Sequence, residues 1–224
     1  LLLIDQYGAD GVRMGMLLSA PAGNDILFDE SLCKQGLGFC NKIWNAFRLL
    51  KGWEIADIEQ PENSKIAIEW FDAKLKVACS EIDELFSKYR LSEALMTAFK
   101  LFVDEFSGWY LEMVKPSYMQ PCDRETYSAT LRYFDLLMKI IHPFMPFITE
   151  EIWQQIYERK EGCSIMTEPL ALTAPTDDML KLVSDIEVVK NIVGGIRTVR
   201  NQKNIPPKES LSLEIIGHEP LLKY

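Results

Sequence analysis

The 224-residue sequence has few of the residues from which catalytic and metal sites are built. Histidine occurs only twice, at His142 and His218, and none of the cysteines forms a CxxC pair. Glycine-rich nucleotide loops and the GxSxG and HExxH sequences are also missing. Because zinc sites, nucleotide cradles and hydrolase nucleophiles depend on such patterns, the sequence predicts no catalytic residue, no metal site and no cofactor in this chain.

Long apolar runs are missing as well, so the sequence predicts no membrane span and no signal peptide. The odd number of cysteines predicts reduced core residues of a cytoplasmic protein. They are Cys33, Cys40, Cys79, Cys122 and Cys163. Nearly half of the residues, 48%, are hydrophobic, which is enough for a sizeable core. The chain opens on Leu1 rather than Met, which suggests a piece of a larger protein.

One stretch of this acidic chain has no acidic residue. The formal net charge is −9, yet residues 31–53 contain four cations and no Asp or Glu. Wound as a helix, one side of this stretch carries Phe39, Ile43, Trp44, Phe47 and Leu50. The other side carries Asn41, Lys42, Asn45, Arg48 and Leu49, with Lys34 earlier in the stretch. Cations beside carboxamides suit a partner with phosphates and base edges, although an ordinary solvated face of a bundle helix is the alternative.

A second acid-free basic stretch covers residues 188–208. Its cations are Lys190, Arg197, Arg200, Lys203 and Lys208. Arg197 and Arg200 are three residues apart and share a helix face. These cations either contact an anionic partner or offset the surrounding acids.

Apolar spacings of three and four residues predict helices through most of the chain. We expect two short helices in residues 1–20 with a break at Gly8, and further helices at 29–52, 64–85, 91–113, 127–141, 149–156 and 177–202. Ser64 and Thr149 are expected as N-caps, and Gly52 as a C-cap. Gly36 and Gly38 either loosen their helix or let another backbone approach closely, and Leu211, Leu213 and Ile215 alternate like a strand.

The pattern therefore predicts a mainly α fold. We expect an antiparallel helix bundle over residues 1–162, followed at 163–224 by a small, incomplete α/β piece made of a helix and a strand. The short connections between the helices at 68–85, 91–113 and 127–141 favour antiparallel neighbours.

Three motifs resemble those of class I aminoacyl-tRNA synthetases. The sequence Tyr7-Gly8-Ala9-Asp10-Gly11-Val12-Arg13 is similar to the segment that follows the KMSKS signature of that class. Residues 41–46, Asn-Lys-Ile-Trp-Asn-Ala, and residues 142–153, His-Pro-Phe-Met-Pro-Phe-Ile-Thr-Glu-Glu-Ile-Trp, resemble the valyl-tRNA synthetases among them. Residues 197–208 also fit that pattern, so the resemblance covers essentially the whole chain.

The resemblance implies an anticodon-binding helix bundle that recognises tRNA with a valine anticodon and performs no chemistry itself. By that resemblance Asn41, Lys42, Asn45, Arg48 and Leu49 face the anticodon, and Lys34, Arg197, Arg200 and Lys203 are further candidate tRNA contacts. The family often has an aromatic residue at the position of Leu49 and can have a cation at that of Ser31, so both contacts depart from the pattern.

The resemblance also implies that the parent enzyme attaches valine to tRNA using ATP and Mg²⁺, which bind a catalytic domain outside these residues. That domain would be the second partner, and neither a membrane nor DNA is expected as one. Two alternatives stay open: a helical protein-interaction or scaffold domain without an RNA role, and the same domain of an isoleucyl or leucyl enzyme.

Overall fold

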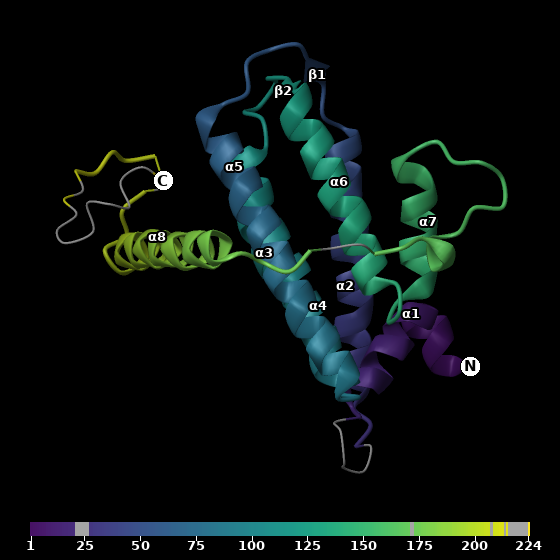
Figure 1. Ribbon diagram of the computed structural model, residues 1–224. Helices are drawn as coiled ribbons and strands as arrows, with labels where there is room; N and C mark the ends of the chain where they lie inside the picture. The colour runs from purple at the N-terminus through teal and green to yellow at the C-terminus, as the bar shows by residue number, and fades with distance from the viewer. Residues whose placement is uncertain (21–26, 171–172, 207, 213, 215–223) are drawn as a thin grey trace. The chain divides into compact units, whose positions relative to one another are not determined.

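The computed structural model describes residues 1–20, 27–170, 173–206, 208–212, 214 and 224 (Figure 1). It consists of two compact units, residues 1–174 and 175–224. None of the helices within the described ranges is long and apolar enough to span a membrane.

The first unit is built around four helical rods that lie side by side (Figure 1). They are α2 (Glu30–Lys51), α3 (Glu62–Ser87), a composite rod at residues 91–114, and α6 (Arg124–Ile141). Successive rods run in opposite directions, which confirms the predicted antiparallel bundle. Aromatic rings fill its core: Phe71 lies 5.4 Å from Phe106 and 5.1 Å from Tyr133, measured between ring centroids.

The composite rod is not the continuous α-helix that the spacing predicts. It consists of α4 (Leu91–Lys100), the π-helix η1 (Leu101–Tyr110) and α5 (Leu111–Val114). After Phe106 the buried residues are Tyr110 and Val114, whereas uninterrupted α-helical spacing of the apolar residues would place Trp109 and Met113 in the core. Hydrogen bonds from i to i+5 widen each turn of a π-helix. The face toward the core is therefore displaced by one residue from the α-helical expectation.

A two-residue parallel pair closes one end of the bundle. Strand β1 (Ile55–Ala56) follows α2, and strand β2 (Cys122–Asp123) precedes α6. The amide of Cys122 also donates to the carbonyl of Glu54 at 2.7 Å. The buried carboxylate of Asp123 then caps α6 by accepting from the amide of Thr126 at 2.8 Å. Strands of two residues leave no alternation in the sequence, so this pairing was not predicted.

Two predicted N-caps are wrong. Helix α3 begins at Glu62 directly after Pro61, so Ser64 lies inside it. Helix α7 (Pro146–Ile156) begins at Pro146, and Thr149 lies in its interior. Proline is favoured at the first position of a helix because its missing N–H needs no partner there. Pro146 occupies this first position in α7, whereas Pro61 is the N-cap residue that precedes α3.

Helix α1 (Leu2–Leu18) is kinked at Gly8, where φ is 73°, as predicted. Beyond the kink, α1 packs closely on α2 through residues without side chains. An added Cβ on Gly15 would lie 2.7 Å from the backbone nitrogen of Cys33, and one on Gly36 would lie 2.6 Å from the carbonyl oxygen of Gly11. Of the two alternatives for these glycines, the close backbone approach holds at Gly36, whereas nothing lies within 4 Å of a Cβ added at Gly38.

The sequence motifs around Asp10 and around Pro143 are joined by hydrogen bonds between side chains of the first and backbone groups of the second. The buried Asp10 carboxylate accepts from the amide of Phe147 at 3.3 Å and from that of Ile148 at 2.7 Å. Arg13 donates from Nη2 to the carbonyl oxygen of Pro143 at 3.2 Å. The first turn of a helix has unsatisfied N–H groups. Asp10 therefore caps α7 across about 140 residues of sequence, which explains why α7 has no capping side chain of its own.

In the second unit, α8 (Asp177–Gln202) confirms the predicted helix, with the side chain of Thr176 as its N-cap. The expected strand is not seen at Leu211, which is described but not in a strand. Leu213 and Ile215 lie outside the described residues. The boundary between the two compact units follows Ala174. The domain boundary expected between residues 162 and 163 therefore stays a prediction.

Substituting Gly15 with Ala should destabilise the protein by about 1–3 kcal/mol, because the added methyl group meets the backbone of Cys33. Gly38→Ala is the matched control in the partner helix. It should leave stability unchanged or raise it by up to about 1 kcal/mol, since Ala favours helix and nothing lies within 4 Å. Urea unfolding followed by circular dichroism measures both. Equal effects of the two substitutions would mean that α1 is not packed on α2 in this way.

Substituting Asp10 with Ala should cost about 1–3 kcal/mol of unfolding free energy, because the amides of Phe147 and Ile148 lose their acceptor. Asp5→Ala removes the same charge from an exposed position of α1 and should change stability by less than about 0.5 kcal/mol. Hydrogen exchange should show faster exchange at these amides of α7 in the Asp10 variant alone. Unchanged protection there would contradict the capping role.

Candidate nucleic-acid interface

Helix α2 is held in place at both ends and along its buried side. Asp29 caps its start by accepting from the amide of Ser31 at 2.8 Å, and Gly52 ends it with φ −88°. Phe39, Ile43 and Leu50 are fully buried toward the bundle core. The turn of the helix therefore fixes which residues face outward.

The outward side carries all five residues predicted to face an anticodon. Asn41, Lys42, Asn45, Arg48 and Leu49 are exposed. Lys34 is exposed as well and lies two turns before Asn41 on the same side. Ser31, whose position can hold a cation in the resembled family, is exposed at the start of the helix. The structure thus brings these residues together on one continuous surface, which we call the α2 face.

The cations of the α2 face differ from those of the neighbouring helix. Each of the three lysines within α3 forms an ion pair, for example Lys74 with Glu105 at 3.2 Å. In the described part of the chain, no acid pairs with Lys34, Lys42 or Arg48. The charge of an unpaired surface cation is not neutralised by a neighbouring acid, so it can attract an anionic partner. The α2 face is therefore the side of this helix that attracts anions most strongly.

Trp44 departs from the prediction that placed it in the apolar side. Its side chain is 37% exposed, and its ring lies 6.0 Å from that of Phe47 between centroids. Trp44 lies three residues after Asn41 and four before Arg48, so it borders the α2 face. A helix that packs on the core with one face buries only part of its circumference. The indole of Trp44 lies at the boundary between the buried and the exposed sides of α2. The α2 face therefore includes an aromatic edge that the sequence pattern did not predict.

The predicted basic residues of the second unit serve partly local purposes. The Arg200 guanidinium donates to the carbonyl oxygens of Pro206 at 2.8 Å and Glu209 at 2.7 Å, which holds the chain after α8. Arg197 and Lys203 are exposed. Lys190 is almost fully buried and pairs with Glu187 at 2.9 Å. A role of Arg197, Arg200 or Lys203 in tRNA binding stays a prediction.

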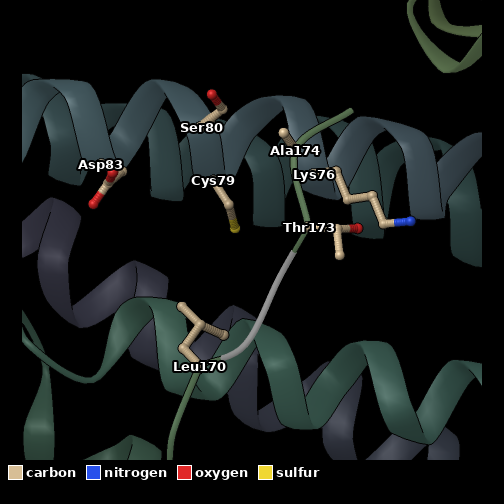
Figure 2. A pocket seen from close by; sticks show the side chains of 7 residues that line it. All are labelled: Lys76, Cys79, Ser80, Asp83, Leu170, Thr173 and Ala174. Atoms are coloured by element: carbon tan, nitrogen blue, oxygen red, sulfur yellow. The ribbon is translucent and has the colours of Figure 1, made fainter. Parts of the chain in front are cut away.

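A separate pocket of about 360 Å³ lies along α3, and none of the residues that line it belongs to α2 (Figure 2). Cys79 and Lys76 line it. Burial raises the pKa of the Cys79 thiol to about 12, so the thiol stays protonated at neutral pH. Lys76 pairs with Asp72 at 2.9 Å. The residues that line the pocket therefore include no activated nucleophile.

His142 is a structural residue at the junction of α6 and α7. Its Nδ1 lies 2.8 Å from the hydroxyl of Thr149, whose own proton is directed to the carbonyl of Met145 at 2.7 Å. The imidazole therefore donates from Nδ1. Burial lowers the pKa of His142, so the ring is neutral at neutral pH. In the described ranges, no three His, Cys, Asp or Glu residues are grouped closely enough to hold a metal ion.

Comparison with known protein families defines the class of this protein. Residues 69–215 match the family described as the anticodon-binding domain of tRNA ligase, so the chain belongs to that family. The matched region runs from α3 through α8, and the α2 face precedes it.

Relatives of known function are more specific. The chain is 60% identical to a valine–tRNA ligase of Phocaeicola vulgatus over 99% of its length and 60% identical to one of Parabacteroides distasonis over 97%. It is 56% identical to a valine–tRNA ligase of Bacteroides thetaiotaomicron over 99%. It spans about a quarter, 25%, of each of these relatives. The resemblance to valyl-tRNA synthetases is thereby confirmed.

Among solved structures, a leucyl-tRNA synthetase of Agrobacterium radiobacter K84 in a ternary complex with tRNA is similar to this chain, with a TM-score of 0.48 and 19% sequence identity. The similar region covers 81% of this chain and 21% of the synthetase chain.

At neutral pH a maleimide reagent should label Cys163 fastest, because this thiol is exposed. Cys163 is thus not the core residue that the sequence predicted. Cys40 and Cys79 should react far more slowly, since burial raises the pKa of each to about 12 and keeps both thiols protonated at pH 7. Peptide mass mapping after timed labelling measures the order, and urea-unfolded protein serves as the control. Labelling of Cys79 as fast as Cys163 would contradict the described burial.

Proposed function

We propose that this chain is the anticodon-recognition region of a valine–tRNA ligase and binds tRNA with a valine anticodon through the α2 face. The observation that carries the proposal is the set of unpaired cations and carboxamides on α2, a helix without acids after Glu30 in a chain of net charge −9. The relatives, all valine–tRNA ligases by name, support the valine identity and argue against an isoleucyl or leucyl parent.

Within the α2 face, we assign contacts by chemistry. Lys42 and Arg48 suit phosphates, because counterion release makes such contacts the main source of affinity. Asn41 and Asn45 can donate and accept toward the Watson–Crick edges that an unpaired loop exposes. Leu49, 45% exposed, offers apolar contact to a base. Affinity and sequence preference should therefore separate by residue type.

The parent enzyme, by this proposal, attaches valine to tRNA in the cytoplasm with ATP and Mg²⁺ bound outside these residues. A catalytic domain would be the second partner. Exposed apolar residues near the start of the chain support such a contact, since exposed apolar groups mark interaction sites. They are Ile4 and Met16 on α1, and Phe147 on α7. Arg197, Arg200 and Lys203 remain candidates for further tRNA contacts.

A scaffold domain without an RNA role is the second candidate, and the acidic net charge favours it. A titration of the chain with valine tRNA at two salt concentrations distinguishes the two. RNA binding through cations weakens as salt rises, whereas a scaffold domain would not bind tRNA at all.

Lys42→Ala should weaken tRNA binding and reduce the slope of log affinity against log salt by about 0.7 to 1, the value of one phosphate contact. Lys100→Ala is the matched control, because Lys100 is an exposed lysine of α4 without an ion pair among the described residues. It should leave the slope unchanged. Equal slopes for both variants would contradict a phosphate contact at Lys42.

Asn45→Ala should instead reduce discrimination between valine tRNA and a tRNA with a substituted anticodon, by about 1–3 kcal/mol. The salt slope should stay as in the wild type, since no charge is removed. Fluorescence anisotropy with both tRNAs measures the difference. Unchanged discrimination would mean that Asn45 is only a solvated residue of the bundle.

A further inference from the structure

The α2 face leads at its C-terminal end into a groove of about 500 Å³. One side of the groove consists of Leu49, Trp53 and Glu54 at the end of α2, and the other of the loop 115–120. Leu49 belongs to both the groove and the α2 face. A molecule bound along α2 would therefore reach the groove without crossing another part of the bundle.

The loop side of the groove presents an aromatic and an apolar residue to solvent. Tyr118 is 90% exposed and Met119 is 83% exposed. The turn that carries them is closed by a hydrogen bond from the amide of Gln120 to the carbonyl of Ser117 at 2.9 Å. Met119 has φ 60°, which is uncommon for a residue other than glycine. Both side chains are almost fully solvated, so they are free to contact a partner that enters the groove.

The opposite side of the groove is a fixed surface. Trp53 is half-buried, and its ring packs on Tyr127 with 6.4 Å between centroids. The hydrogen bond of 2.7 Å between Cys122 and Glu54, together with the β1–β2 pair, joins this side to the end of the loop. The two sides of the groove are thus held at a defined spacing.

The charges in the groove favour a base over a phosphate. Lys115 is the only cation among the residues that line it, and Glu112 pairs with that lysine at 2.6 Å. Glu54 adds a carboxylate that forms no ion pair with any residue the structure describes, and it repels phosphate but can accept from the exocyclic amino group of a base. An aromatic ring, apolar neighbours and a hydrogen-bonding edge together match the chemistry by which proteins hold unpaired bases.

We propose that this groove binds one unpaired nucleobase of the anticodon loop, with the Tyr118 ring as its stacking surface. The ring at Tyr118 then supplies the stacking that the aliphatic Leu49 does not provide. This inference rests on the tRNA-binding function proposed above and adds a second site, on the loop 115–120, to the α2 face.

The test is a titration of the 224-residue chain with fluorescently labelled valine tRNA. Tyr118→Ala should weaken binding by about 5- to 150-fold, the range of base–aromatic stacking, and Tyr118→Phe should bind like the wild type. Tyr89→Ala is the matched control, because Tyr89 is 85% exposed with positive φ in the turn between α3 and α4, at the other end of the bundle. It should bind like the wild type.

An abasic series identifies the occupant. Each tRNA of the series lacks one base of the anticodon loop, and one of them should lose affinity by the same factor as Tyr118→Ala. With that tRNA, the substitution should cost nothing further, because the two changes remove the same contact. Additive losses with every abasic tRNA would overturn the proposal.

Further outcomes separate this proposal from the one it rests on. If the wild-type chain binds tRNA and Tyr118→Ala binds it with an affinity within twofold of the wild type, the proposed base site is wrong. The proposal for the α2 face would then stand. Failure of the wild-type chain to bind tRNA would overturn both proposals. Sedimentation provides the remaining check: self-association that Tyr118→Ala abolishes would assign the groove to a second copy of the chain and overturn the base site.

Discussion

The contact between α1 and α2 through glycines is the constraint on which much of the first unit depends. Gly15 and Gly36 bring the two backbones so close that a methyl group on either would overlap the partner. That approach fixes α1, and α1 in turn supplies Asp10 to the start of α7. The same contact occupies one side of α2, so the residues left outward are set by packing rather than by their own polarity.

Helices α2 and α3 differ in whether the cations on their surfaces are paired with acids. The lysines within α3 form ion pairs with neighbouring acids, and the opposite charges of each pair largely cancel one another's electric field. On α2 the acids are missing, so the field of Lys42 and Arg48 remains. Salt screens charges beyond about 8 Å at physiological ionic strength, so the net charge of −9 matters less at this face than its nearest neighbours. An acidic protein can therefore carry a local site for an anion.

The sequence predicts most of this fold because helix periodicity records which residues are buried. The rods and the outward face of α2 follow from this periodicity, whereas the kink follows from Gly8 itself, because glycine adopts positive φ without steric cost. Features without periodicity escaped: the two-residue strands, the helix starts at prolines, and the groove at the loop 115–120, whose sides lie more than 60 residues apart. The π-helix produced a definite error, because a widened turn buries Tyr110 where α-helical spacing expects Trp109.

The error at Trp44 has a different cause and bears on function. Residue spacing assigns each position of a helix to a buried or an exposed side. The indole of Trp44 lies at the boundary between the two, with part of its ring against Phe47 and part in solvent. Composition alone cannot assign such a residue, since the outcome depends on how closely α2 is packed. Asn41 and Arg48 flank Trp44 at helical spacing, which makes this edge both apolar and hydrogen-bonding. That combination suits a ligand that has flat apolar faces and polar edges, as nucleobases do.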